Sequence, residues 1–112
     1  AIRGARILLL GMAYKKNVSD MRESPALEIL HSLKKMGAQV TYHDPYVPEI
    51  KHDGHHLKSL PLTPALLRKQ HLVILVTDHE GFDKKTILRN SPFIFDTRNF
   101  FGGIKSDKVV RL

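Results

Sequence analysis

One polar loop holds most of the residues in this sequence that could bind a charged ligand. Between Gly11 and Glu23 the chain places three cations, an aromatic ring and two carboxylates: Tyr14, Lys15, Lys16, Asp20, Arg22 and Glu23. The loop follows a short apolar run and leads into Ser24-Pro25, which is a typical helix start. Because open α/β sheets bind ligands where strands end and helices begin, we expect a ligand site here, with phosphate as the first candidate.

Each cation would meet phosphate in a different way. Lys15 can act as a point charge, whereas Arg22 and Arg98 can each donate two parallel hydrogen bonds. Backbone N–H groups near Ser24 add positive potential, and Tyr14 can stack on a base or donate its hydroxyl. An alternative stays open, in which Lys15 is solvated and Arg22 pairs with a neighbouring carboxylate, because surface ion pairs are common.

Short apolar runs alternate with helical patterns along the rest of the chain. The runs predict strands at 7–10, 39–42, 72–76 and 93–95, with a short edge strand at 108–112. Helices are expected at 24–36, 63–70 and 83–89. The stretch between the second strand and the second helix has the Pro, Gly and His content of an irregular surface loop.

This order of elements is typical of an α/β fold. We expect a three-layer, Rossmann-like domain in which a parallel sheet carries helices on both faces, with 1–112 forming a single domain. Parallel strands bring their carboxyl ends to one edge, which we call the carboxyl edge. The segments 11–23, 44–45, 77–79 and 96–98 should therefore lie together there.

The pattern invites the interpretation that this domain binds NAD by itself. It has a strand, a glycine turn, a helix, a second strand and an acid, Asp44, after that strand. The dinucleotide fingerprint needs three glycines, however, and Gly11 stands alone. We therefore expect no independent NAD site, and we interpret Asp44, which precedes Pro45, as a turn residue.

The histidines suggest two further sites. His52, His55 and His56, with Asp53, could collect zinc or nickel, but nothing holds their geometry rigid, so we expect a solvated loop and no metal site. His79 ends a strand at the carboxyl edge, so it is a better candidate for a ligand or interface contact. Its simpler role would be to cap the helix that follows.

The composition excludes several classes of protein. With 112 residues, 42% hydrophobic and 26% charged, the chain resembles an ordinary globular domain. The absence of cysteine excludes disulfides, cysteine zinc sites and a thiol nucleophile within this chain. We find no membrane-length apolar run and no signal-peptide layout, so we expect a cytoplasmic protein. A net charge of +7 favours anionic partners, but the scattered cations argue against nucleic acid.

A longer pattern resembles one known family. The motifs are Gly11–Asn17, Asp20–Pro25, Tyr42–Pro45, Thr77–His79 and Asp96–Arg98. In order and spacing they are similar to the C-terminal UDP-binding domain of the UDP-glucose/GDP-mannose dehydrogenase family, over essentially the whole chain. Within the family, the sequences of residues 17–25 and 77–79 look closest to those of enzymes that oxidise UDP-N-acetylhexosamines, in particular UDP-N-acetylglucosamine 6-dehydrogenases.

The resemblance implies an activity and residue roles. Family enzymes oxidise the C6 alcohol of a nucleotide sugar to a carboxylate in two NAD-dependent hydride transfers, through a thiohemiacetal on a cysteine. By this resemblance Tyr14, Lys15 and Arg98 contact the UDP-sugar, and Arg22 approaches NAD that is bound mainly by the N-terminal domain. The resemblance also implies that the oxidised sugar serves surface polysaccharide synthesis. The full-length enzyme is expected to be a homo-oligomer.

The chain lacks parts that the activity needs. It has no three-glycine loop, no cysteine nucleophile and none of the family's central helices, and no spacing in it suggests a catalytic centre. We therefore expect a C-terminal fragment of a larger dehydrogenase that is inactive alone, with the N-terminal and central parts as its partners. A stand-alone nucleotide- or anion-binding interaction module without catalysis remains the alternative.

Overall fold

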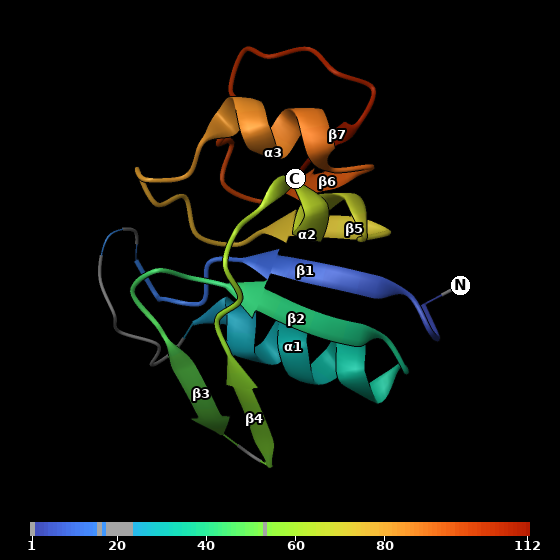
Figure 1. Cartoon of the computed structure of the whole chain (residues 1–112), viewed down its shortest axis with the longest axis vertical. Coiled ribbons are helices and arrows are strands. Elements are labelled where there is room, and N and C mark those ends of the chain that lie inside the picture. Colours follow the sequence, from blue (N-terminus) through green and yellow to red (C-terminus); the bar gives the residue numbers. More distant parts are fainter. Residues whose placement is uncertain (1, 16, 18–23, 53) are drawn as a thin grey trace.

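Five parallel strands form the central sheet of this computed structural model, in the order β2-β1-β5-β6-β7 (Figure 1). The structure describes residues 2–15, 17, 24–52 and 54–112. The strands are β1 (Arg6–Leu10), β2 (Gln39–His43), β3 (Glu49–His52), β4 (His55–Lys58), β5 (Leu72–Leu75), β6 (Ile94–Asp96) and β7 (Val109–Arg111), and the helices are α1 (Pro25–Lys35), α2 (Pro64–Arg68) and α3 (Lys84–Asn90).

Strand β1 shows how the sheet separates two cores. Ile7 and Leu9 pack against α1, whereas Leu8 and Leu10 join Leu67 of α2 and the residues around α3. All four β1 side chains are almost fully buried, because successive residues of a strand point to opposite faces. The sheet therefore carries helices on both faces, and the expected three-layer α/β fold is confirmed.

Helix α1 begins and ends as its sequence predicts. The Ser24 hydroxyl accepts a hydrogen bond from the Ala26 N–H at 3.1 Å, and Pro25 takes the first helical position, where no N–H is needed. Gly37 has φ +93, and the Gly37 and Ala38 N–H groups donate to the carbonyls of Lys34 and Leu33. These caps fix the residue at which the loop from β1 must end.

The segment after β2 differs from the expected irregular loop. Strands β3 and β4 form an antiparallel hairpin that lies beside α1 and outside the main sheet (Figure 1). Ile50 is fully buried and Leu57, opposite it, is half-buried. Polar residues occupy most other positions of the hairpin, so the sequence lacks the apolar alternation that signals strands. The segment is therefore a hairpin and not the irregular loop predicted from the sequence, although His52 and His56 are exposed, as expected of a solvated segment.

Candidate functional site

The strand order gives β1 the position beside which open α/β sheets commonly bind ligands. The chain moves from β1 to β2 on one side and returns to β5 on the other, and such a reversal opens a crevice at the carboxyl ends of the two flanking strands. Gly11 and Thr77 line this point. A Cβ on Gly11 would lie 2.5 Å from the Thr77 Cβ, and Gly11 has φ +94, so only glycine fits.

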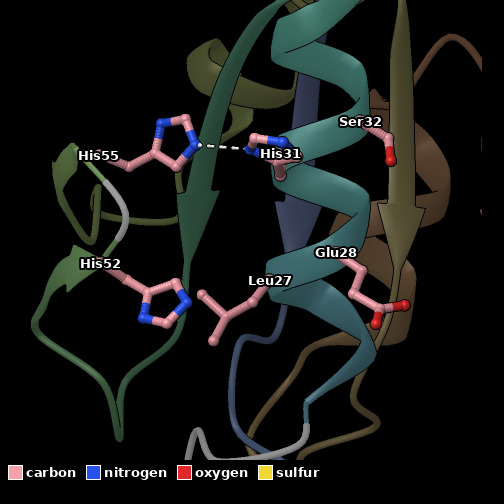
Figure 2. Close-up of a pocket in the computed structure, with 6 residues that line it drawn as sticks. All are labelled: Leu27, Glu28, His31, Ser32, His52 and His55. Carbon is pink, nitrogen blue, oxygen red and sulfur yellow. Dashed lines mark hydrogen bonds between the residues drawn. The ribbon is translucent and has the colours of Figure 1, made fainter.

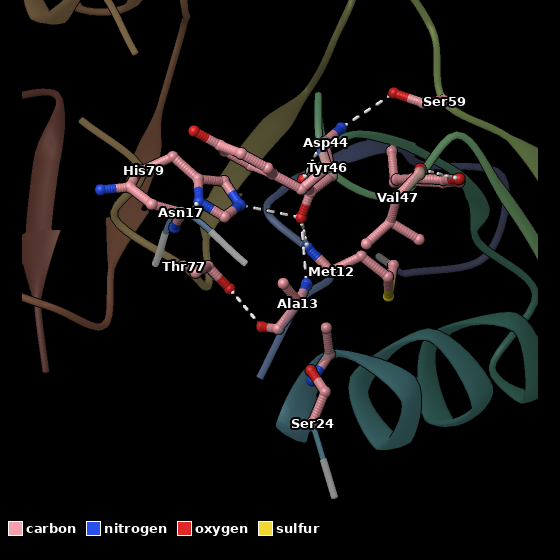
Figure 3. A network of polar contacts seen from close by, with 12 residues as sticks. Met12, Ala13, Asn17, Ser24, Asp44, Tyr46, Val47, Ser59, Thr77 and His79 are labelled. Carbon is pink, nitrogen blue, oxygen red and sulfur yellow. Dashed lines mark hydrogen bonds and ion pairs between the residues drawn. The ribbon is translucent and has the colours of Figure 1, made fainter. Parts of the chain in front are cut away.

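Asp44 joins three segments of the carboxyl edge (Figure 3). One carboxylate oxygen, Oδ2, accepts hydrogen bonds from the Met12 N–H at 2.6 Å, the Ala13 N–H at 3.0 Å and the His79 Nε2 at 2.9 Å. The other oxygen, Oδ1, accepts from the Tyr46 N–H at 2.8 Å. The side chain has no exposed surface. A buried carboxylate at the end of β2 therefore holds the start of the loop that follows β1.

His79 extends this network to Asn17. The Asn17 N–H donates to His79 Nδ1 at 2.7 Å, and the Asn17 side-chain oxygen accepts from the Glu80 N–H at 3.1 Å. Asn17 adopts a left-handed backbone with φ 61, which asparagine tolerates better than most residues. Thr77 adds a hydrogen bond from its hydroxyl to the Ala13 carbonyl at 2.8 Å. We call Asp44, His79, Asn17 and Thr77 the Asp44 network.

The hydrogen bonds determine the protonation of the network. Since Nδ1 of His79 accepts from Asn17, the ring carries its proton on Nε2 and donates it to Asp44. Burial alone would raise the pKa of Asp44, but the donors from Met12, His79, Tyr46 and Ala13 together hold that pKa below its usual value. The network thus contains a carboxylate and a neutral imidazole, each supplied with partners.

A second buried carboxylate shapes the loop after β6. Asp96 is 1% exposed, and its two oxygens accept hydrogen bonds from the Arg98, Phe100 and Phe101 N–H groups at 2.9–3.0 Å. These three donors lie two to five residues beyond Asp96. The carboxylate therefore fixes the backbone that carries Arg98 from within its own loop.

The expected site residues lie on exposed parts of this edge. Tyr14 is 43% exposed, and the Lys15 ammonium lies 5.8 Å from the centre of its ring, within cation–π range. The Arg98 side chain is half exposed, and its Nε lies 3.7 Å from Asp78 Oδ1. Arg22, the expected NAD-facing residue, lies outside the described residues.

The positions of these groups suit an extended anion. Tyr14 and Lys15 follow β1 and Arg98 follows β6, and these strands are separated only by β5. Two strand spacings amount to roughly 10 Å, so the two cationic groups can flank one elongated ligand across the end of β5. Asp78, which follows β5, lies beside Arg98 and partly offsets its charge, and the Asp44 and Asp96 carboxylates are buried beneath the edge.

The same edge does not fit a dinucleotide held in the usual way. Asp44 stands where a ribose-binding acid would stand, but its oxygens already accept four hydrogen bonds and have no exposed surface. The hydrogen bond from Tyr46 confirms Asp44 as a turn residue. Asp44 is thus used inside the fold and is not free to bind a ribose.

His79 corrects one expectation and shows what the sequence concealed. It is fully buried in the Asp44 network, so it contacts no ligand or interface at the surface, and Asp83, not His79, caps α3. Sequence reasoning also missed Asn17 as a structural residue. The signal that could have found it is its residue type, because asparagine is enriched in left-handed turns.

Family comparison agrees with this geometry. A model of the UDP-binding domain of the UDP-glucose/GDP-mannose dehydrogenase family matches residues 8–103. This chain belongs to that family. Its matched region contains Tyr14, Lys15, Arg98 and the whole Asp44 network.

Individual relatives of this UDP-binding domain are much longer proteins. The chain is 32% identical over 117 residues to a UDP-glucose 6-dehydrogenase of Rhizobium meliloti, covering 98% of this chain and 26% of the relative. It is 32% identical over 98 residues to an NDP-N-acetyl-D-galactosaminuronic acid dehydrogenase of Ralstonia solanacearum, covering 85% and 23%. The chain thus spans about a quarter of the curated relatives it matches.

Solved structures share the fold of this domain. A UDP-D-ManNAc dehydrogenase from Pyrococcus horikoshii superposes with a TM-score of 0.74 at 23% identity, over 96% of this chain and 25% of that one. A UDP-glucose dehydrogenase from Pyrobaculum islandicum gives 0.65 at 32% identity, over 84% and 22%. Among the described residues, no helix is long and apolar enough to cross a membrane.

Proposed function

We propose that this domain binds the UDP part of a nucleotide sugar at its carboxyl edge, within an NAD-dependent 6-dehydrogenase. The observation that carries the proposal is the family match over 8–103, which includes an edge where exposed cations stand over a buried hydrogen-bonded framework. Lys15 and Arg98 would neutralise the pyrophosphate from either side of β5. Tyr14 would stack on the uracil or donate its hydroxyl.

The rest of the reaction would lie outside this chain. In the proposed enzyme an upstream domain holds NAD, which accepts the two hydrides when the C6 alcohol is oxidised to a carboxylate. Another part supplies the cysteine nucleophile, because this chain contains none. Arg22 would approach the NAD from this domain. We further propose a cytoplasmic, homo-oligomeric enzyme, and we expect the 112-residue chain alone to form no NADH.

The proposed sugar is a UDP-N-acetylhexosamine, closest to UDP-N-acetylglucosamine. One support is the amino-acid sequence of residues 17–25 and 77–79. Another is that relatives in Ralstonia solanacearum and Methanococcus maripaludis are named for N-acetylated sugars. Other relatives are named for UDP-glucose. Turnover by the parent enzyme with UDP-glucose and UDP-N-acetylglucosamine tests the preference, and faster oxidation of UDP-glucose would contradict it.

Calorimetric titration with UDP tests the binding proposal. Lys15→Ala and Arg98→Ala should each weaken binding by about tenfold or more, since charge-assisted hydrogen bonds contribute roughly 1.5–3 kcal/mol. Lys35→Ala is the matched control, because it removes an exposed lysine from the last turn of α1, at the end of that helix opposite the carboxyl edge. Binding should also weaken with added salt.

Two outcomes would contradict the proposal. The first is no measurable heat up to about 1 mM UDP, which corresponds to less than roughly 4 kcal/mol of binding free energy. The second is an equal loss of affinity in Lys35→Ala, which would show a response to net charge alone. The parent reading frame provides a separate test, because the proposed enzyme requires an upstream glycine-rich βαβ unit and a cysteine.

A further inference from the structure

A histidine-lined pocket lies away from the carboxyl edge, between α1 and the β3–β4 hairpin (Figure 2). Its volume is about 280 Å³, and it is lined by Leu27, Glu28, His31, Ser32, His52 and His55. None of these residues belongs to the Asp44 network or to the proposed UDP contacts. The pocket therefore needs an explanation of its own.

Two imidazole nitrogens from different elements meet at this pocket. Nδ1 of His31 on α1 lies 3.4 Å from Nε2 of His55 on β4. This separation is long for a hydrogen bond, for which donor and acceptor usually lie within about 3.2 Å. It equals the edge of a tetrahedron whose Zn–N bonds are roughly 2.05 Å long, which is also about 3.4 Å. Two imidazoles at this spacing can occupy two positions around one metal ion.

The surroundings of the pair favour a cation that prefers nitrogen ligands. His52 stands directly opposite His55 in the hairpin register, so both side chains lie on the face turned toward α1 (Figure 2). Glu28 also lines the pocket, although its carboxylate is directed away from the histidines (Figure 2). Within the described residues, no group of three or more His, Cys, Asp or Glu side chains is placed to hold a metal ion. Any metal site here would therefore have the two histidines as its only protein ligands.

We propose that His31 and His55 form a two-histidine chelate for a late transition metal such as Zn²⁺ or Ni²⁺, with water in the remaining positions. Imidazole suits these ions, and the absence of cysteine removes the thiolate ligands that would select softer ones. Because the ligands come from α1 and β4, a bound ion would cross-link the helix to the hairpin. This inference does not depend on the proposed nucleotide function.

Titration of the 112-residue chain with Zn²⁺ and with Ni²⁺, followed by calorimetry and by histidine ring ¹⁵N shifts, tests this site. One saturable site should appear, with ring-nitrogen shifts at His31 and His55. His31→Gln and His55→Gln should each weaken binding by about tenfold or more, because a chelate reduced to one ligand loses its second metal bond. His31 is exposed, so removing it should leave the circular dichroism of the metal-free chain unchanged.

His56→Gln is the matched control. His56 follows His55 on β4, but its Nε2 lies 3.1 Å from the Glu49 carboxylate on the other side of the hairpin. Metal affinity should stay within about twofold of the unmodified chain. The proposal is overturned if binding does not saturate below about 1 mM metal, or if His56→Gln weakens it as much as His31→Gln does. Either result would mean adventitious binding by surface histidines.

Discussion

Two buried aspartates support the two halves of the carboxyl edge, and they do so in opposite ways. Asp96 accepts hydrogen bonds from three N–H groups within its own loop, all two to five residues away. Asp44 accepts one from its own turn, and three from Met12, Ala13 and His79, which are 31 to 35 residues away. One carboxylate organises a single loop, and the other joins three.

This difference has a consequence for binding. Arg98 sits on a loop that Asp96 can shape locally, whereas Tyr14 and Lys15 follow backbone that is positioned only when β2, β5 and their loops are assembled. The Lys15 side of the edge should therefore depend on the whole fold. The loop that carries Arg98 should keep its conformation when residues outside that loop are substituted.

The largest expected effect comes from replacing Asp44, and the same replacement of Asp96 provides the comparison. Asp44→Ala leaves the buried Met12 and Ala13 N–H groups and His79 without an acceptor, and should cost about 3–5 kcal/mol in the free energy of unfolding, since each buried donor left unpaired costs roughly 1–3 kcal/mol. Asp96→Ala should cost less, about 1–3 kcal/mol. Urea unfolding measures both values.

Amide NMR separates the two variants further. Asp96→Ala should shift signals mainly within 97–101, whereas Asp44→Ala should shift signals in all three loops that it joins. Equal losses in the free energy of unfolding, with amide shifts confined to one loop in both variants, would contradict the distinction between the two carboxylates.

A smaller effect is expected from Gly11→Ala. Its Cβ would lie 2.5 Å from the Thr77 Cβ and 2.7 Å from the Thr77 backbone nitrogen, at a φ of +94. Strain and overlap together should cost about 2–4 kcal/mol. Gly54→Ala is the control, because it also has a positive φ but no atom within 4 Å, and should cost only about 1–2 kcal/mol. Similar midpoints of thermal unfolding for the two variants would contradict the close packing of β1 against β5.

The smallest effect concerns pH. Because the pKa of Asp44 is lowered in the folded state, the unfolded chain binds more protons there, and stability rises with pH. Its contribution is complete above the unfolded value of about 3.8 and is lost as the pH falls through the folded pKa. Asp44→Asn should therefore flatten the acid side of the stability curve. An unchanged slope between the variant and the parent chain would show that Asp44 is not ionised in the network.

The sheet and its helices could be predicted from the sequence because their signals are local. Apolar runs marked β1, β2, β5 and β6, and Ser24, Pro25 and Gly37 marked the ends of α1. The β3–β4 hairpin could not be predicted, because Ile50 and Leu57 are the only apolar residues in its two strands. A strand needs a repeating apolar pattern to be recognised in sequence.

The candidate site could be predicted in part, for the same reason. The chemistry of Tyr14, Lys15 and Arg98 follows from their residue types. The parallel sheet brings the carboxyl ends of the strands that precede them to one edge. The partnership of Asp44 with His79 spans 35 residues and leaves no local pattern. His79 therefore looked like a surface ligand, although its ring nitrogens are both used inside the fold.

The most direct test of the carboxyl edge as a nucleotide site is to map UDP binding by backbone amide NMR. The account predicts saturable shifts that cluster at 12–17 and at 97–101, on both sides of β5, and that disappear in a Lys15→Ala/Arg98→Ala double variant. Shifts centred elsewhere, such as the pocket between α1 and the hairpin, or none up to about 1 mM UDP, would contradict it.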